Sequence, residues 1–475
     1  MNRRKFLQSA ALGAPCLALE TWAPPTDITL TLDPTRPSHL IPTNFTGLSY
    51  ESAQLANPAF FSARNQQLIA LFRELSLSGV LRIGGGSSEF TTYSADDPTT
   101  PPPFELFGPD TSHTVKQGTI TSALALHNLR AFLDATGWSC LYGLNLGQGT
   151  VANAVAEALA AAQILGPRLL ALQIGNEPDS FRNRYRPASY APAEFMAEWN
   201  IFHAAIVDRL RAAGLTARFA GPDISNKLTF LTAFADEASR HPDLVFLSGH
   251  YYAMGPAGNP DATLANMLLP DPKLTTLKQR DIPIVLDAAR TAGLPFRVSE
   301  INSCWNGGQA GASDTFASAL WCADTMLRFA ALGFSGVNLH GGGNGIYSPI
   351  VGSASTGFTR RPEFFGIQFA QHFAGSTLLP TLLETSDPRI TAYVFEHNGK
   401  QQVALINKTP TAWRCHLPGI ARPAFELTAP SIDSTSGVQL RKALTHDQRN
   451  TVMLAPYSAR IDNLQPFRAR PGAKP

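Results

Sequence analysis

Two glutamates stand where a carboxylate can do chemistry. Glu177 closes the apolar run at residues 169–177 and precedes Pro178, and Glu300 closes a similar run that begins at residue 296. An apolar run that ends at proline indicates a buried parallel strand, because proline cannot donate to a sheet ladder. A carboxylate at the C-terminal end of a barrel strand is placed for chemistry rather than for packing. The two positions therefore predict a catalytic pair.

Two carboxylates at one face of a barrel favour glycoside hydrolysis. One acid protonates the leaving oxygen, and the other meets the positive charge that develops at the anomeric carbon. A buried glutamate that faces a second carboxylate has a raised pKa, as a general acid needs. We therefore expect Glu177 to be the acid/base and Glu300 the nucleophile, with Asn176 bonded to the sugar 2-hydroxyl. Two unrelated acids at the rim of the fold are the other interpretation.

The elements around this pair predict an α/β fold, a (β/α)8 TIM barrel. Apolar strand patterns alternate with amphipathic helical patterns for about three hundred residues, as in such barrels. Glu177 and Glu300 lie 123 residues apart, which places them at the ends of strands four and seven. An open doubly wound sheet would need a glycine-rich turn after the first strand, and the sequence has none there. The eight expected strands are residues 45–51, 80–85, 140–147, 169–177, 218–223, 245–252, 296–302 and 336–341.

The pattern changes near residue 377 to short alternating strands, which predicts a C-terminal β-sandwich. Asn398-Gly399 between two of these strands indicates a tight hairpin. The expected units are an export signal at 1–23, an N-terminal strand at 24–42 that joins the sandwich, the catalytic barrel at 43–376 and the sandwich at 377–475. Residues 87–118 are rich in proline and threonine without a period, and we expect a loop at the mouth of the barrel.

Composition limits the class of protein. Of 475 residues, 44% are hydrophobic, which is ample for a large core, and only 16% are charged. Arg3 and Arg4 begin a twin-arginine-like signal, so a periplasmic or secreted location is expected. Without residues 1–23, 35 basic residues face 35 acidic ones, and no basic tract remains for a nucleic acid to contact. No segment is long and apolar enough to span a bilayer, and the remaining cysteines are expected as buried thiols.

Residues 26–466 resemble the family 79 glycoside hydrolases, which include β-glucuronidases and heparanase. The resemblance implies net retention of configuration, an acid/base after strand four and a nucleophile after strand seven. Asn-Glu-Pro is shared by a wider clan of barrel glycosidases, so that motif bears on mechanism rather than on substrate. The matching segments are residues 81–85, Asn176-Glu177-Pro178, His250-Tyr251-Tyr252, Ser299-Glu300 and residues 362–366.

Four further residues are candidates near the glutamates. Tyr251 ends strand six and is expected to donate to Glu300, or else to line the barrel. Glu51 resembles the family acid that holds distal hydroxyls of the terminal sugar. Arg82 and Arg297 lie inside strands, where a buried arginine normally pairs with a carboxylate. We expect both arginines to orient the two glutamates, or else to form structural pairs within the barrel.

The loop after strand eight is the candidate site for a uronate carboxylate. Its glycine-rich run ends at Gly345, Ile346 and Tyr347, and such a run can expose backbone N–H groups as an anion nest. Family β-glucuronidases are similar here, although a flexible loop with a packed aromatic residue is the other interpretation. Trp305 is expected to stack on a sugar or to seal the barrel edge. The arginines at 182, 184 and 186 are expected mainly as solvated charges.

The function that these features favour is an exo-acting retaining β-glucuronidase that acts on a glucuronic-acid-containing glycan or a glucuronide. Neither a metal nor another cofactor is expected. Three alternatives remain at this point: another retaining β-glycosidase of the same clan, such as a β-glucosidase or xylosidase; an endo-acting heparanase-like enzyme; and a carbohydrate-binding protein without activity. The sequence has few basic residues, which favours exo over endo action. An enzyme that cleaves a sulfated polymer is expected to carry clusters of basic residues along its cleft.

Overall fold

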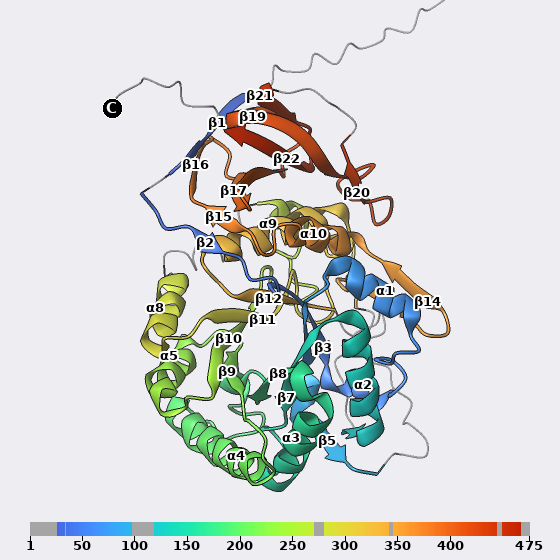
Figure 1. The fold of residues 1–475 in the computed structure, drawn as a ribbon, viewed down its shortest axis with the longest axis vertical. Helices are drawn as coiled ribbons and strands as arrows, with labels where there is room; N and C mark the ends of the chain where they lie inside the picture. The colour runs from blue at the N-terminus through green and yellow to red at the C-terminus, as the bar shows by residue number, and fades with distance from the viewer. Residues whose placement is uncertain are drawn as a thin grey trace, which may run out of the picture.

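A computed structural model of the protein describes residues 26–33, 35–96, 118–269, 280–341, 345–443 and 449–466. The expected export signal at 1–23 lies outside these residues, as do 97–117 of the expected loop. Figure 1 shows a barrel wrapped by helices, with a β-rich unit stacked on one side of it. Among the described residues, none of the helices combines the length and the apolar character needed to cross a bilayer.

The barrel consists of eight parallel strands that close in sequence order. Its strands are β3 (Thr46–Glu51), β4 (Val80–Gly84), β7 (Ser139–Leu144), β8 (Leu169–Ile174), β9 (Phe219–Ile224), β10 (Leu244–Tyr252), β11 (Phe296–Asn302) and β12 (Gly336–His340). Each of them overlaps one of the eight strands expected from the sequence. The predicted TIM barrel is therefore confirmed, and β8 and β11 are its fourth and seventh strands.

Helices cover the outside of the barrel, as βα alternation requires. Their ends carry local signals: Ser122 caps α2 by accepting from the Ala125 N–H at 3.2 Å, and Gly137 ends the same helix with φ 85°. The helices are α1 (Gln66–Leu75), α2 (Ala123–Thr136), α3 (Val151–Leu165), α4 (Pro192–Ala212), α5 (Leu228–Glu237), α6 (Leu264–Leu268), α8 (Ile282–Ala292), α9 (Phe316–Ala331) and α10 (Pro362–Gln371). Short 3₁₀ helices are η1 (Ser52–Ala56), η2 (Gly86–Phe90), η3 (Gly166–Arg168), η4 (Pro178–Ser180) and η5 (Ala238–Arg240).

The interior of the barrel changes from apolar to polar along its axis. Early positions of five neighbouring strands form an apolar cluster of Val80, Leu141, Ala171, Ala220 and Phe246. Further along, the inward positions of β4, β8, β9, β10 and β11 are polar. These residues, Arg82, Gln173, Asp223, Ser248 and Ser299, form one hydrogen-bonded network. The polar end of the interior is the end where the strands finish.

The C-terminal unit is a sheet of ten strands, seen at the top of Figure 1. Strand β1 (Thr26–Leu32) lies in it, antiparallel to β16 (Thr381–Glu384) and parallel to β19 (Trp413–Thr428). Asn398 and Gly399 both have positive φ between β17 (Ile390–His397) and β18 (Lys400–Asn407), which confirms the expected tight hairpin. The other strands of this sheet are β2 (His39–Leu40), β15 (Thr377–Leu379), β16 (Thr381–Glu384), β17 (Ile390–His397), β18 (Lys400–Asn407), β19 (Trp413–Thr428), β20 (Gln439–Lys442), β21 (Arg449–Leu454) and β22 (Ser458–Pro466).

A buried ionic cluster joins the two units. Asp324 of α9 receives hydrogen bonds from Tyr393 and Thr391 of β17, both at 2.7 Å, and from Lys408 at 2.6 Å. Arg328 lies 3.1 Å from the same carboxylate. Separating the sheet from α9 would leave these buried charges uncompensated, which is strongly destabilising. The cluster therefore holds the sheet against α9.

The segment after β4 is more regular than expected. It forms η2 and then β5 (Thr91–Ser94), which pairs in parallel with β6 (Thr119–Ser122). β5 and β6 have four residues each, so the alternation of their side chains is too short to be recognised in a sequence rich in proline and threonine.

The segment after β12 forms an antiparallel hairpin of β13 (Ile350–Ser353) and β14 (Gly357–Arg360).

Candidate active site

The two glutamates meet at the C-terminal end of the barrel. Glu177 follows β8 with φ 51° and ψ 51°, and Pro178 after it begins η4. A carboxylate oxygen of Glu177, one of Glu300 and a ring nitrogen of His250 lie within 4.8 Å of one another. Left-handed backbone is uncommon for a residue other than glycine, and it turns the Glu177 side chain away from the strand direction. The structure thus brings together the two acids that the sequence singled out.

Glu300 is surrounded by donors and positive charges. Arg82 donates from Nη1 to its Oε2 at 2.8 Å, and the Tyr252 hydroxyl donates to its Oε1 at 2.7 Å. Burial alone would raise the pKa of Glu300. The positive charges of His340, His250 and Arg82 outweigh that penalty and lower the pKa to about 2. Glu300 is therefore ionised near neutral pH.

His250 connects the two acids. Its Nδ1 lies 2.9 Å from Oε1 of Glu177, and its Nε2 lies 3.3 Å from Oδ2 of Asp223. Burial lowers the pKa of His250, but the negative charges of Asp223 and Glu300 raise it to about 10. The ring is consequently an imidazolium near neutral pH, and both of its N–H groups can donate.

Arg82 is the central cation of the barrel interior. Its Nη2 donates to Oδ2 of Asp223 at 2.6 Å and to Oδ1 of Asn176 at 2.7 Å, while its Nη1 binds Glu300. Burial opposes its charge, but Asp223 and Glu300 hold the pKa of Arg82 above its usual range. Asn176 is thus fixed by an arginine, which leaves its amide NH₂ group to donate elsewhere.

Glu89 holds the ends of two strands together. This buried carboxylate in η2 accepts from the N–H groups of Leu146 and Gly147, after β7, and of Asn176, after β8. Burial raises the pKa of Glu89 to about 7, against the lowering effect of these amides. The backbone that carries Glu177 is therefore anchored one residue before the acid itself.

A cavity of about 530 Å³ opens over these groups. Trp305 lines it with 45% of its surface exposed, whereas Tyr347 is 4% exposed. The residues that line the cavity include Glu51, Ser87, Glu177, Arg184, Ser225, Asn226, His250, Tyr252, Glu300, Trp305, His340 and Tyr347. A concave site with both carboxylates at its floor and an aromatic side chain at its rim suits a carbohydrate ring.

Glu51 lies in this cavity at the end of β3. The N–H of Ser87 donates to its Oε2 at 2.7 Å, and the hydroxyl of Ser87 binds the same oxygen. His340 Nε2 lies 3.5 Å from its other oxygen. Gly85 has φ 71°, and a Cβ there would lie 2.5 Å from the Glu51 carboxyl group, so only glycine lets the chain pass this close.

The expected role of Tyr251 is wrong, because its neighbour makes the contact with Glu300. Side chains alternate along β10, so Tyr252 faces the interior with His250 and Tyr251 faces outward. The Tyr251 ring packs edge-on against Phe329 of α9 with 5.5 Å between centroids. Its buried hydroxyl has no hydrogen-bond partner among the described residues.

The expected contact of Arg297 with a glutamate is also wrong. Arg297 lies at the start of β11, three residues before Glu300, and its Nε donates to Oδ1 of Asn338 at 2.7 Å. Its remaining donors point to backbone carbonyl groups, including that of Asn44 at 3.2 Å. Burial lowers the pKa of Arg297 to about 9. Arg82 alone of the two arginines contacts Glu300.

The loop after β12 only partly matches the expected anion nest. Tyr347 lines the cavity, but its N–H donates to the Gly307 carbonyl at 3.2 Å. The carbonyls of Gly345 and Ile346 accept from Nη1 of Arg361 at 2.7 and 2.8 Å. The Tyr347 N–H is therefore committed to Gly307, and the carbonyls of Gly345 and Ile346 are turned toward Arg361. Residues 342–344 of the expected nest lie outside the described residues.

Sequence reasoning did not assign roles to Asp223, His250, Tyr252, His340 or Glu89. The first four lie at or near the C-terminal ends of barrel strands, which is the criterion that selected the glutamates. That criterion applied to every strand would have found them. Glu89 lies in an irregular segment and carries no comparable signal.

A cation would fit the geometry of Glu177, His250 and Glu300, but not their charges. His250 carries protons on both nitrogens at neutral pH, and Arg82 already compensates Glu300. The chemistry of two carboxylates needs no metal.

The chain is similar to curated β-glucuronidases. It is 25% identical to one from Aspergillus niger over 384 residues, which cover 75% of this chain and 68% of that protein. It is 27% identical to one from Neurospora crassa over 368 residues, which cover 69% of this chain and 64% of that protein. The chain is a glycoside hydrolase. The resemblance to family 79 indicated by its motifs is confirmed by these relatives, although no protein-family model matches.

Solved structures share the fold of this glycoside hydrolase. A 4-O-α-L-rhamnosyl-β-D-glucuronidase from Fusarium oxysporum has a TM-score of 0.71 and 19% identity, over 92% of this chain and 100% of that one. A family 51 arabinofuranosidase from Xanthomonas axonopodis has a TM-score of 0.69 and 15% identity, over 92% and 100% of the two chains. Both support the barrel with its attached β-sandwich.

Proposed function

We propose that this glycoside hydrolase is an exo-acting, retaining β-glucuronidase. The observation that carries the proposal is the approach of the Glu177 and Glu300 carboxylate oxygens to within 4.8 Å. Retaining enzymes place their two carboxyl groups about 5–5.5 Å apart, whereas inverting enzymes leave about 6.5–9.5 Å for a water molecule. The names of the curated relatives and of the Fusarium structure support a glucuronide as substrate.

The proposed mechanism assigns one role to each acid. Glu300, ionised because Arg82, His250 and His340 surround it, attacks the anomeric carbon and forms a glycosyl-enzyme intermediate. Glu177 gives a proton to the leaving oxygen and then takes one from the incoming water. Asn176, fixed by Arg82, binds the 2-hydroxyl, and Glu51 accepts from a distal hydroxyl.

The same proposal includes recognition of the uronate and export of the protein. His340 and Tyr347 lie in the cavity beside Glu51, and an imidazole N–H group and a phenol hydroxyl can both donate to a carboxylate group. Arg184 at the rim is available to an acidic neighbouring sugar. The twin-arginine-like start supports a periplasmic or secreted location, which fractionation of expressing cells would test.

Hydrolysis of 4-nitrophenyl β-D-glucuronide tests the activity. We expect turnover with retention of the β-anomer, followed by NMR, and a monosaccharide product from a glucuronate-ended oligosaccharide. A β-glucoside turned over faster than the glucuronide would favour another glycosidase of the clan, an oligosaccharide product would favour endo action, and binding without turnover would favour a binding protein.

Paired amide variants test the two roles. Glu300→Gln should lower kcat by at least about 10⁴, because it removes the nucleophile. Glu177→Gln should lower kcat by about 10²–10⁴ for a poor leaving group and by less for 4-nitrophenol, which needs little protonation. Glu74→Gln, on the exposed pair with Arg360, is the matched control and should keep wild-type rates. Equal losses for both leaving groups in Glu177→Gln would contradict its role.

A further inference from the structure

Two histidines and an aspartate gather at the opposite end of the barrel from the glutamates. His203 comes from α4, His241 follows η5, and Asp243 directly precedes β10. One ligand atom from each lies within 4.8 Å of the others. Because His250 comes seven residues after Asp243 on the same strand, the two sites are about 23 Å apart along it. We propose that these three side chains bind a zinc ion.

The His203–Asp243 contact already has nearly the spacing of two zinc ligands. His203 Nε2 lies 3.1 and 3.0 Å from the two carboxylate oxygens of Asp243. Ligand bonds of about 2.0–2.2 Å at tetrahedral angles place neighbouring ligand atoms about 3.3–3.6 Å apart. A zinc ion could therefore replace the shared proton if His203 Nε2 and the Asp243 carboxylate oxygen moved only slightly further apart.

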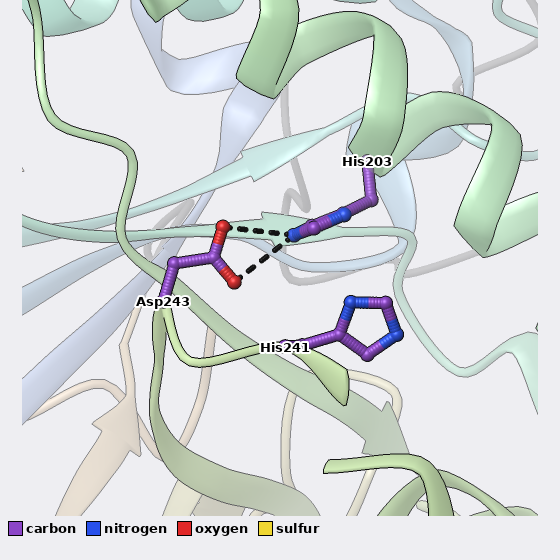
Figure 2. Close-up of side chains that lie close together, drawn as sticks. All are labelled: His203, His241 and Asp243. Carbon is purple, nitrogen blue, oxygen red and sulfur yellow. Dashed lines mark hydrogen bonds and ion pairs between the residues drawn. The ribbon is translucent and has the colours of Figure 1, made fainter. Parts of the chain in front are cut away.

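His241 supplies the third donor. Figure 2 shows its ring beside the pair, with one nitrogen turned toward the Asp243 carboxylate. This nitrogen is Nδ1, which is bonded to the ring carbon that carries the side chain. The rings of His203 and His241 lie 4.6 Å apart at 76°. Nε2 of His241 lies on the far side of the ring, where it is buried and has no hydrogen-bond partner among the described residues. A neutral imidazole with an unprotonated nitrogen is the form that binds a metal.

The surrounding chain holds these ligands in place before any ion binds. Trp199 stacks on His203 with 4.6 Å between ring centroids and an interplanar angle of 17°. The His241 carbonyl accepts from Leu244 N–H at 3.0 Å, and the Asp243 carbonyl accepts from Phe219 N–H at 2.9 Å. His241 and Asp243 thus lie in one fixed turn. A preformed site loses less entropy when it binds an ion.

The donor set favours zinc over magnesium or calcium, which prefer sites of oxygen ligands alone. Three protein ligands leave a fourth position for water, and the partial exposure of His241 and Asp243 gives an ion access. At this distance from the glutamates, the expected role is to tie α4 to the start of β10 rather than to take part in catalysis. The competing interpretation is a plain His–Asp ion pair.

Zinc binding should be measured on the full chain with Glu300→Gln, after treatment with EDTA. This background removes one ligand of the Glu177, His250 and Glu300 group, which is the other cluster with metal-ligand spacing in the described part of the chain. Calorimetric titration with ZnCl₂ should give one ion per chain, and the ion should raise Tm. Trp199 fluorescence should change on binding, because this ring stacks on a ligand. Cobalt should give the absorption bands of a tetrahedral site.

His241→Ala in the same background should weaken zinc binding at least about tenfold and abolish the zinc-dependent rise in Tm. Asp243→Asn should do the same, which gives a second variant if the first does not fold. His416→Asn is the matched control, because His416 lies 3.7 Å from Asp27 in an exposed pair, and it should bind zinc like the parent. Zinc affinity unchanged by both ligand variants, or no saturable binding below about 100 µM in the parent, would overturn the proposal.

Discussion

The two buried arginines of the barrel show how one residue type is used differently at the two ends of one fold. Arg82 lies toward the mouth and bonds with Asp223 and Glu300, at 2.6 and 2.8 Å. Arg297 lies near the base and donates to Asn338 and to backbone carbonyls. Carboxylates hold the pKa of Arg82 above its usual range, whereas burial among neutral acceptors lowers that of Arg297 to about 9.

This difference teaches that burial alone does not identify a functional arginine. The base of the barrel needs a long side chain that satisfies several carbonyls at once, and a guanidinium with five N–H donors does this. At the mouth, the positive charge of Arg82 lies beside Glu300 and favours its ionised form, as the proposed role of nucleophile requires. The partner of the arginine, rather than its depth, separates the two roles.

The largest expected effect is on Arg82. Arg82→Met leaves Asp223 and Glu300 buried without the cation that bonds to both of them, which should cost about 3–5 kcal/mol of the free energy of unfolding and abolish measurable turnover. Arg297→Met leaves the side-chain oxygen of Asn338 and several backbone carbonyls without this donor, so it should cost about 1–3 kcal/mol while kcat stays within about threefold of wild type. Urea denaturation and glucuronide hydrolysis measure both. Equal losses of turnover would break the distinction between the two arginines.

A smaller effect separates two neighbouring tyrosines of β10. Tyr252→Phe removes a hydrogen bond to the charged Glu300, which is worth about 1.5–3 kcal/mol, so kcat/KM should fall about 10–150-fold. Tyr251→Phe removes a buried hydroxyl without a partner in the described part of the chain, so the rate should be unchanged and the stability equal or slightly higher. A larger rate loss in Tyr251→Phe than in Tyr252→Phe would reverse the assignment of the inward face.

The smallest effect concerns pH. The pKa of Glu300 is lowered to about 2 from an ordinary value of 4.5, so its ionisation should not limit kcat/KM above about pH 3. Tyr252→Phe should move this acid limb upward by about one unit, or about 1.4 kcal/mol. Because the folded pKa is depressed, the stability that Glu300 contributes is present above pH 4.5 and lost as pH falls toward 2. Unfolding at pH 2–5 measures the second effect, and an acid limb that does not move in the variant would contradict the first.

Patterns among neighbouring residues in the sequence were enough to predict the barrel strands and a tight turn. Alternating apolar runs and helical patterns gave the eight strands of the barrel, because strand periodicity depends on neighbouring residues alone. Asn398-Gly399 specified a tight turn for the same reason, since only such residues readily adopt positive φ at both positions. The approach of Glu177 to Glu300 followed from the closure of the barrel, which carries the ends of strands four and seven to one mouth.

Only the tertiary structure decided which side chains face one another. Tyr251 and Tyr252 differ by one position, and a single step along a strand exchanges the interior for the outer face. Arg297 and Arg82 look alike in sequence, but their depth along the barrel axis sets whether carbonyls or carboxylates surround them. Glu89 binds amides from two strand ends, and His203 meets His241 and Asp243 across a helix and a turn. Such contacts join segments far apart in the chain, and no local pattern encodes them.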